Sequence, residues 1–375
     1  MDNLDIENLV KTLSKYKVAL AHDYLIKNGG AEKCLVAFHE LFPNAPVYTL
    51  IYDTIGTNGL YEGWDIRTSY LQNRVGANKY IDYYRLVMPQ AVESFNLDEY
   101  DIVISDSSSF IKGIITQPKT KHICYMHTPT RFLWFDINKH IGRAKFLSSL
   151  KSFIPYFLHK VRIWDTLAAE RPDIIIANSL TTKKRISKFY HRDSSVINPP
   201  VEIGTYGKRN VLDYYLLVSR LEPHKDIEVA IKSAMLARVK LKIVGSGTDE
   251  ARLRSMAGSN IEFLGHVSDE EKNKLFQGAI AFLAPQTEDF GITMVEALSH
   301  GCPVIANDDG GASEIVQPGK TGILIKDLTS DLLCEVLKSN VVLKINDDDC
   351  ADSVKKYSTD NFKINILKEI MKAVR

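Results

Sequence analysis

The chain has 375 residues, of which 45% are hydrophobic and 25% are charged, and its formal net charge at pH 7 is +1. This length is sufficient for two globular domains, and the average composition excludes a disordered or fibrous chain. Because the net charge is close to zero, no overall field attracts nucleic acid, and we expect no nucleic-acid partner. The five cysteines are far apart and form no C-x-x-C pair, which argues against zinc ligation and dithiol redox chemistry.

The segment 1–16 is polar and acidic and lacks the apolar core of a signal peptide. No window approaches the roughly 18 consecutive apolar residues that a membrane-spanning helix needs. We therefore expect a cytoplasmic protein and leave open whether it also rests on the inner face of a membrane.

Short β-branched runs alternate with helical patterns through the first half of the chain. Strands are predicted at 17–22, 46–52, 100–106, 122–127 and 173–178, and helices at 30–41, 78–95 and 180–190. Such alternation is typical of a parallel sheet with helices on both faces. We predict a first Rossmann-like domain over residues 1–200.

The alternation restarts after residues 190–210, which contain paired prolines and little periodicity and are predicted to form a linker. Strands are predicted at 214–219, 240–245, 261–265, 280–284, 303–306 and 321–325, with helices at 226–237, 268–278 and 290–300. We predict a second Rossmann-like domain over 201–355 and a C-terminal helix within 356–375, whose packing partner the periodicity leaves open. The acidic run 347–349 is expected to be a solvated loop.

The chain is therefore predicted to be an α/β protein with two doubly wound domains. Open parallel sheets bind ligands beyond the carboxyl ends of their strands. Two such domains facing each other would place a ligand in the cleft between them.

The stretch 284–316 is the richest in polar residues that could serve a site. Glu288 lies in a loop after a predicted strand, and Glu296 lies eight residues later inside the following helix. That helix is opened by Phe290, Gly291 and Ile292. A helix start offers unpaired N–H groups and a positive dipole end to a phosphate, and a carboxylate at 296 suits a ribose diol. Two solvated glutamates are the plain alternative, but a second strand and a glycine turn at the same sheet edge favour a site.

Two basic residues, Arg220 and Lys225, follow the predicted strand 214–219. Taken alone, this spacing is common on protein surfaces, but beside the glutamate motif it favours a site, where fixed cations would stabilise a departing diphosphate without reorganising. The glycine turn at 244–247 would need a further glycine where Glu250 stands, so binding of a nicotinamide dinucleotide is disfavoured.

In the first half, Gly29 and Gly30 open a predicted helix, where glycines allow a backbone to approach a phosphate closely. A simple helix start is the alternative. His127 ends the predicted strand 122–127, where a histidine serves either structure or substrate contact. Residues 139–162 alternate basic and apolar side chains, which suits either an anionic membrane surface or an ordinary helix that covers the domain, and Pro155 would interrupt one long helix.

Several of these elements occur in order: E-D-F-G at 288–291, Glu296, and G-x-P-V-I-A, G-G and E-I-V between 301 and 316. Together they resemble the retaining glycosyltransferases of family 4, which have the GT-B fold. The resemblance implies that the first domain binds the acceptor and the second the nucleotide-sugar donor. It also implies roles for single residues: Glu288 beside the transferred sugar, Glu296 on the ribose, Arg220 and Lys225 on the pyrophosphate, His127 near the reacting carbon, and Gly29 and Gly30 near the pyrophosphate and acceptor.

The run H-T-P-T-R-F-L-W at 127–134 is similar to bacterial GDP-mannose-dependent mannosyltransferases of surface polysaccharide assembly, such as lipopolysaccharide. The resemblance thus implies retaining transfer of a hexose, with mannose from GDP-mannose as the leading donor, onto a glycan or polyprenyl-linked acceptor. Guanine and uracil both remain open, and residues 265–268 are expected to contact the base. No D-x-D loop ends a strand of the sheet core, so we expect neither a metal nor a cofactor.

Other functions fit the same architecture. A nucleotide-sugar epimerase or hydrolase would turn over the donor without an acceptor. A non-catalytic nucleotide-sugar-binding partner would keep Arg220 and Glu296 but would not need His127 and Glu288.

Overall fold

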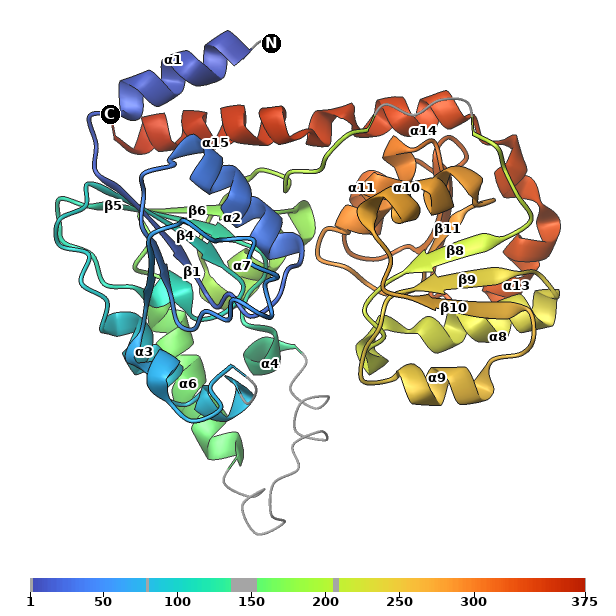
Figure 1. Cartoon of the computed structure of the whole chain (residues 1–375), viewed down its shortest axis with the longest axis horizontal. Coiled ribbons are helices and arrows are strands. Elements are labelled where there is room, and N and C mark those ends of the chain that lie inside the picture. The colour runs from blue at the N-terminus through green and yellow to red at the C-terminus, as the bar shows by residue number, and fades with distance from the viewer. Residues whose placement is uncertain (1–2, 79–80, 136–153, 205–208, 375) are drawn as a thin grey trace. The chain divides into compact units, whose positions relative to one another are not determined.

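The computed structural model describes residues 3–78, 81–135, 154–204 and 209–374 (Figure 1). The chain divides into two compact units, the first made of residues 1–200 with 360–375 and the second of residues 201–359. Each unit is built on an open parallel sheet, as the alternation of elements predicts. Among the described residues, no helix is long and apolar enough to cross a membrane.

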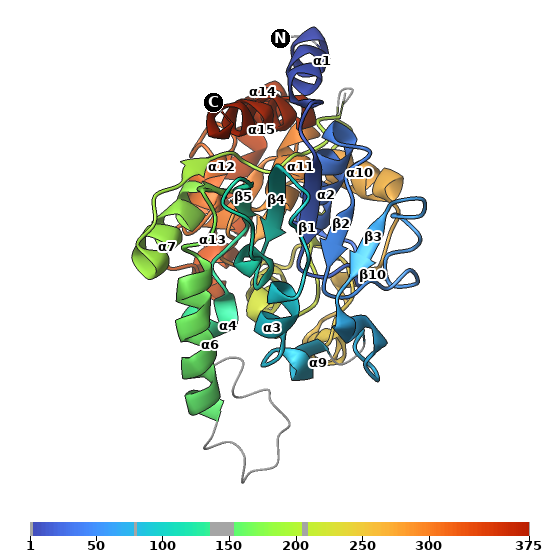
Figure 2. The same cartoon turned by 90° about the vertical axis from the view of Figure 1, so that its left-hand side faces the viewer.

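The sheet of the first unit has the strand order β3-β2-β1-β4-β5-β6-β7 (Figure 2). Its strands are β1 (Val18–His22), β2 (Val47–Thr49), β3 (Ile66–Thr68), β4 (Ile102–Ser107), β5 (Lys121–Met126), β6 (Ile174–Ala177) and β7 (Ser195–Val196). Its α-helices are α1 (Asn3–Leu13), α2 (Gly30–Leu41), α3 (Met88–Glu93), α4 (Arg131–Trp134), α6 (Ile154–Ala168), α7 (Leu180–Tyr190) and α15 (Thr359–Ala373). Short 3-10 helices are η1 (Tyr70–Asn73), η2 (Ile81–Tyr84) and η3 (Ile111–Gly113).

Alternate residues of one strand are buried on opposite faces of this sheet. Leu20 packs in a core with α1, α2 and α15, whereas Ala19 and Ala21 pack in another core with α3 and α6. Ile102 and Val103 divide in the same way. A parallel sheet covered on both faces needs apolar side chains at successive positions, which is why its strands stand out as continuous apolar runs.

The C-terminal helix α15 packs on the sheet of the first unit. Its Phe362 ring lies 5.4 Å from the ring of Phe38 and 5.5 Å from that of Tyr125, measured between centroids. Ile366 and Ile370 are buried in the same core. The C-terminal helix, whose packing partner the sequence left open, therefore packs on the first unit and not on the second.

The sheet of the second unit has the order β10-β9-β8-β11-β12-β13. Its strands are β8 (Tyr215–Val218), β9 (Leu241–Val244), β10 (Ile261–Gly265), β11 (Phe282–Ala284), β12 (Val304–Asn307) and β13 (Gly322–Ile325). Its α-helices are α8 (Ile227–Ala237), α9 (Glu250–Met256), α10 (Asp269–Gly278), α11 (Ile292–Ser299), α12 (Ala312–Ile315), α13 (Ser330–Ser339) and α14 (Asp347–Val354). The 3-10 helices are η5 (Pro223–Lys225), η6 (Val341–Lys344) and η7 (Lys355–Tyr357).

Two sequence predictions are wrong. The single helix predicted over 78–95 is the short η2 and the separate α3, because Pro89 lacks an N–H and stands at the start of a helix. The acidic run 347–349 is not a loop but the first turn of α14. Asn346 caps this helix by accepting hydrogen bonds from the backbone N–H groups of residues 348 and 349, and acidic side chains favour the positive end of a helix dipole.

Candidate functional site

The candidate site of the second unit lies where its strand order reverses. The parallel strands β8 and β11 pair at the centre of the sheet, at Leu216 and Phe282. The strand that follows β8 in the chain, β9, lies on one side of this pair, and the strand that follows β11, β12, lies on the other. Arg220 and Lys225 follow β8, and Glu288 follows β11. The carboxyl ends of such neighbouring strands form a crevice at the sheet edge, the usual ligand position in open α/β sheets.

Lys225 and Glu288 are brought together as an ion pair. The Lys225 ammonium lies 2.6 Å from Glu288 Oε1, and the Gln286 side-chain amide donates to the same oxygen at 2.9 Å. Both charged side chains are partly buried, with 13% and 25% of their surface exposed. Arg220 is exposed immediately after β8. The loop that carries Arg220 is held by the 244–247 turn, because the N–H of Leu221 donates to the carbonyl of Ser246 at 2.9 Å.

The glycine pair Gly310–Gly311 explains why the E-D-F-G loop has its shape. The N–H of Gly311 donates to the carbonyl of Glu288 at 2.8 Å. A Cβ on Gly310 would lie 2.2 Å from that carbonyl oxygen, and one on Gly311 would lie 1.8 Å from the carbonyl oxygen of Phe290. Such approaches are possible only without a side chain. The downstream glycines of the motif therefore support the loop that presents Glu288.

Helix α11 starts at Ile292, and Gly291 precedes it with a φ of +103°. The ring of Phe290 is buried in the core, 5.3 Å from the ring of Tyr357 in an edge-to-face contact. Any contact between Phe290 and a nucleotide-sugar donor would therefore come from the Phe290 backbone.

Glu296 of α11 faces a lysine that the sequence reading missed. Lys272 of α10 lies with its ammonium 3.5 Å from Glu296 Oε2 and 2.8 Å from Asp269 Oδ1. Burial alone would lower the pKa of Lys272, but Glu296 and Asp269 raise it above the ordinary value. The Glu296 side chain is only 12% exposed. The neighbouring ammonium holds the Glu296 carboxylate in place, where it could accept hydrogen bonds from a ribose diol.

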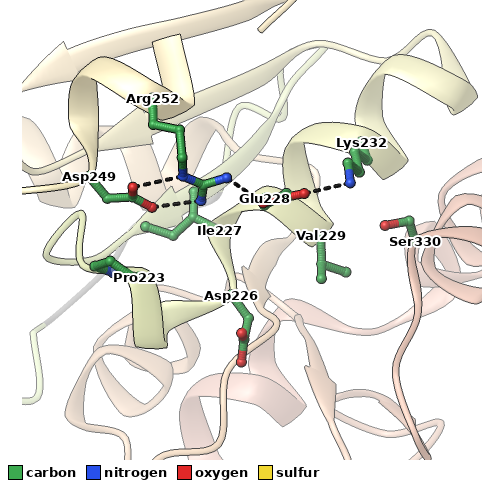
Figure 3. A pocket seen from close by; sticks show the side chains of 9 residues that line it. All are labelled: Pro223, Asp226, Ile227, Glu228, Val229, Lys232, Asp249, Arg252 and Ser330. Atoms are coloured by element: carbon green, nitrogen blue, oxygen red, sulfur yellow. Dashed lines mark hydrogen bonds and ion pairs between the residues drawn. The ribbon is translucent and has the colours of Figure 1, made fainter. Parts of the chain in front are cut away.

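A pocket beside the Lys225 turn is lined by residues of α8, α9 and the start of α13 (Figure 3). Its cations are already paired: Arg252 lies 2.7 Å from Asp249 and 2.5 Å from Glu228, which also pairs with Lys232 at 2.5 Å. The residues that line it include neither Glu288 nor Glu296. We therefore regard this pocket as part of the support for α8 rather than as the ligand position.

The first unit has a second polar centre at its own point of strand reversal, between β1 and β4. His22 and Asp106 are register partners on these strands. The Asp106 carboxylate lies 2.9 Å from His22 Nδ1 through one oxygen and 2.6 Å from His127 Nε2 through the other. Its side chain is fully buried, that of His22 is 3% exposed and that of His127 is 13% exposed.

The charges in this centre are mutually stabilised. Burial alone would lower the pKa of His22, but Asp106 and Glu32 raise it to about 10. Burial alone would raise the pKa of Asp106, but its charge interactions and hydrogen bonds with His127 and His22 lower it. His22 is therefore an imidazolium and Asp106 a carboxylate at neutral pH.

Asp23, the residue after β1, holds the loop after β4. Its carboxylate accepts hydrogen bonds from four successive backbone N–H groups at 2.7 to 2.9 Å: Ser108, Ser109, Phe110 and Ile111. Sequence reading did not single out His22, Asp23 or Asp106. Gly29 precedes α2 in an extended conformation and Gly30 is the first residue of the helix, so the helix start predicted there is present.

Among the described residues, Cys34, Asp106 and His127 bring one potential metal-ligand atom each within 4.8 Å of one another. The Asp106–His127 hydrogen bond already uses two of these atoms, and burial raises the pKa of the Cys34 thiol well above its ordinary value. A protonated thiol is a poor metal ligand. The metal independence of the protein stays a prediction.

Most of the predicted basic amphipathic segment 139–162 lies outside the described residues. The described part begins α6, with Pro155 as its second residue. Four large apolar side chains of α6 are exposed: Tyr156 by 57%, Phe157 by 45%, Ile163 by 45% and Leu167 by 60%.

Residues 203–356 match the family model described as Glycosyl transferases group 1. The phosphatidyl-myo-inositol mannosyltransferase of Mycobacterium leprae (strain TN) is 35% identical over 128 residues, which cover 32% of this chain and 34% of that protein. The GDP-mannose-dependent monoacylated alpha-(1-6)-phosphatidylinositol monomannoside mannosyltransferase of Corynebacterium glutamicum is 36% identical over 135 residues, which cover 32% of this chain and 35% of that protein. The chain thus spans only 34% and 35% of the length of these two curated relatives.

The crystal structure of Anabaena HepE in complex with UDP and glucose matches 95% of this chain and 100% of that chain, with a TM-score of 0.68 and 18% sequence identity. A likeness of this kind shows the fold, and it confirms the predicted architecture. Residues 203–356 are therefore a glycosyl transferases group 1 domain, carried by a chain whose two parallel-sheet α/β units have the GT-B fold.

Proposed function

We propose that the protein is a glycosyltransferase that moves a hexose, with mannose from GDP-mannose as its leading donor, onto a glycan or lipid-linked acceptor with retention at the anomeric carbon. The observation that carries this proposal is the Lys225–Glu288 pair, at 2.6 Å, at the central carboxyl edge of the matched domain. Glu296 on the next helix supplies a carboxylate for the ribose. The preference for mannose is supported by the names of both mannosyltransferase relatives, and the preference for guanine by the name of the Corynebacterium glutamicum relative.

The roles follow from the charges. A departing nucleoside diphosphate gains about two negative charges, and the cations Arg220 and Lys225 would stabilise it. Glu288 neutralises Lys225 in the absence of donor. On donor binding, the ammonium turns to the diphosphate, and the released carboxylate accepts hydrogen bonds from the sugar hydroxyls.

A same-face route, in which a phosphate oxygen of the donor takes the proton of the acceptor hydroxyl, keeps the anomeric configuration without a covalent enzyme intermediate. Glu288 suits this route because the Gln286 amide donates to its Oε1 and the sugar hydroxyls would donate to the same carboxylate, and both contacts weaken it as a nucleophile. We propose no cofactor and no metal.

Thermal unfolding with GDP, UDP and ADP, each with and without EDTA, tests the donor. We expect GDP alone to raise the midpoint, by the same amount with EDTA, because the site uses lysine and arginine for the diphosphate. A rise with UDP alone would keep the enzyme class and overturn the guanine assignment. No rise with any nucleotide, at concentrations far above a micromolar Kd, would contradict the transferase proposal.

The stereochemistry and the rival activities are read from the products of GDP-mannose. NMR of the sugar freshly released by slow hydrolysis without an acceptor should show α-mannose together with GDP, and hydrolysis faster than transfer to an added glycan acceptor would favour the hydrolase alternative. Release of β-mannose would contradict retention. Conversion of GDP-mannose into another GDP-hexose would favour the epimerase alternative.

We also propose that the exposed apolar face of α6 rests on an anionic membrane, which suits a lipid-linked acceptor. Tyr156, Ile163 and Leu167 lie on it at helical spacing, and the Lys160 ammonium lies 5.6 Å from the Tyr156 ring centre. Apolar residues flanked by a lysine are typical of helices at a bilayer surface. The wild-type protein should sediment with phosphatidylglycerol vesicles and not with vesicles of phosphatidylcholine alone. The double variant I163S/L167S should sediment less with the phosphatidylglycerol vesicles. Unchanged sedimentation would contradict this contact.

A further inference from the structure

The Asp106 centre of the first unit has a feature that packing does not require, namely a fully buried carboxylate shared by two histidines. We propose that Asp106 is a positioning residue of the transfer reaction: it locks the His127 ring so that Nε2 is its donor to Asp106 and Nδ1 is the nitrogen that accepts a hydrogen bond from a hydroxyl of the substrate. The second part of this inference rests on the proposed function.

The backbone of His127 is already fixed without Asp106. Its N–H donates to the Ser107 carbonyl at 2.8 Å, and its carbonyl accepts from Thr182 Oγ1 at 3.0 Å. Its ring lies edge-to-face against Tyr125, with centroids 5.2 Å apart. What these contacts leave undetermined is which ring nitrogen faces inward. The 2.6 Å hydrogen bond to Asp106 Oδ1 decides that.

The protons follow from the charges. An ionised carboxylate only accepts hydrogen bonds, so both nitrogens that face Asp106 carry a proton. His127 is therefore the tautomer with Nε2–H, and its Nδ1 has a lone pair when the ring is neutral. His22 binds the other oxygen of Asp106 as an imidazolium and keeps that carboxylate charged.

Among the residues that the structure describes, the other titratable groups around Asp106 do not change protonation in the neutral range. On α2, Cys34 has a thiol whose pKa burial raises well above the ordinary value, and Glu32 is an anion 3.9 Å from His22 Nε2. Burial likewise raises the pKa of Tyr125 on β5 and of Tyr61. These groups keep their protonation states across neutral pH, so the tautomer of His127 depends on Asp106 and His22.

Position explains why this matters for function. Asp106 and His22 lie at the end of the two central strands, the place where an open α/β sheet takes its ligand. Buried charges that shift each other's pKa gather at functional sites more than elsewhere. A histidine that serves only packing would need neither a carboxylate nor a cationic partner behind it.

The test is a double-variant cycle of Asp106→Asn and His127→Ala, measured as the rate of GDP release from GDP-mannose. The amide that replaces the carboxylate in Asp106→Asn offers one acceptor and one donor to two histidines that both donate, so the ring of His127 loses its fixed orientation. We expect each single variant to lose about 10- to 100-fold in kcat, the effect of misplacing one catalytic contact. The double variant should lose no more than His127→Ala alone, while KM for GDP-mannose stays within about threefold.

Losses that multiply in the double variant would overturn the proposal, because Asp106 would then act independently of His127. The matched control is Ser105→Ala, one residue earlier on β4, which removes the buried 2.8 Å hydrogen bond to His122 Nε2. It should keep the wild-type kcat. A loss in Ser105→Ala equal to that of Asp106→Asn would assign the effect to general packing and also overturn the proposal.

A measurement on the wild-type protein remains decisive if Asp106→Asn does not fold. Long-range ¹H–¹⁵N NMR of the imidazole rings, with His127→Ala used for assignment and the pH raised until the His127 ring is neutral, should show a protonated Nε2 and an unprotonated Nδ1 for His127. The opposite tautomer would overturn the positioning role. Wild-type protein that releases neither GDP from a GDP-sugar nor UDP from a UDP-sugar would contradict the proposed function, whereas the tautomer would still report on Asp106.

Discussion

The two units share the order of their first six strands, to which the first unit adds a seventh, but they build their polar centres differently. In the second unit, Lys225, Glu288 and Glu296 come from loops and a helix beyond the strands, and they are partly exposed. In the first unit, His22 and Asp106 belong to the strands themselves and are buried. The open centre consists of pairs that a ligand can exchange, whereas the buried centre is a fixed arrangement that orients one reachable side chain, His127.

The largest expected effect comes from removing one charge of another buried ion pair in the first unit, Lys112–Asp165. The Lys112 ammonium lies 2.5 Å from Asp165, with both side chains at most 1% exposed, and Thr130, Trp134 and Tyr190 donate to the same carboxylate at 2.7 Å. Breaking a buried pair leaves an uncompensated charge, so Lys112→Met should lower the free energy of unfolding by about 3–5 kcal/mol in urea titrations.

The control is an exposed pair of the second unit, Lys274–Glu270 at 2.7 Å on α10. Lys274→Met should leave the free energy of unfolding unchanged within the error of the same titration, because solvent screens such pairs. Equal effects in the two variants would remove the contrast between the units.

The next largest effect concerns the open centre. Lys225→Ala should reduce the kcat of GDP release from GDP-mannose about 100-fold, the scale of losing one group that stabilises transition-state charge. The control is Lys232→Ala, which removes a lysine that pairs with Glu228 within α8, the helix after Lys225. This variant should leave kcat within about twofold of wild type. Full activity of Lys225→Ala would exclude it from the site.

A smaller effect is expected on nucleotide affinity. Glu296→Ala should weaken GDP binding about tenfold by calorimetry, because it removes hydrogen bonds from a charged acceptor. Lys272→Met should weaken it less, about threefold, since Lys272 acts through Glu296, at 3.5 Å. Lys274→Met, on the outer face of the same helix, is the control. Unchanged affinity in Glu296→Ala would refute the ribose assignment.

The two centres also differ in how far sequence alone predicts them. Glu288, Glu296 and the glycines that support them lie within one stretch of the chain, and their order is recognisable because the loop and helix are continuous. Lys272 was missed because it reaches Glu296 from a different helix, and a lysine on a polar helix resembles any solvated one. Asp106 was missed because its partners lie 84 and 21 residues away, and only strand register brings them together.

The same reasoning applies to the fold. The long apolar runs of β1, β4, β5 and β8 were predicted because a sheet covered on both faces imposes them. Strand β7 has only two residues, and β3 contains a single apolar residue, Ile66, and is largely exposed, so neither forms an apolar run. Three successive aspartates suggest solvation and so predict a loop at the start of α14. The Asn346 cap instead makes these aspartates favourable in the first turn of a helix.

The last effect that we predict is the pH dependence of stability from His22. Its pKa is raised from 6.5 to about 10 on folding, so its stabilisation is complete below pH 6.5 and is lost as the pH rises toward 10. Between pH 7 and 9 the wild-type free energy of unfolding should fall more steeply than that of His22→Asn, by about 1 kcal/mol per pH unit. The cysteines that ionise on unfolding affect both proteins equally, so the difference isolates His22.

The control is His122→Asn, because burial lowers the pKa of His122 to about 3, and this histidine is neutral in both states above pH 7. Its slope should equal the wild-type slope, and a His22→Asn slope equal to both would show that His22 is not the buried cation that holds Asp106 ionised.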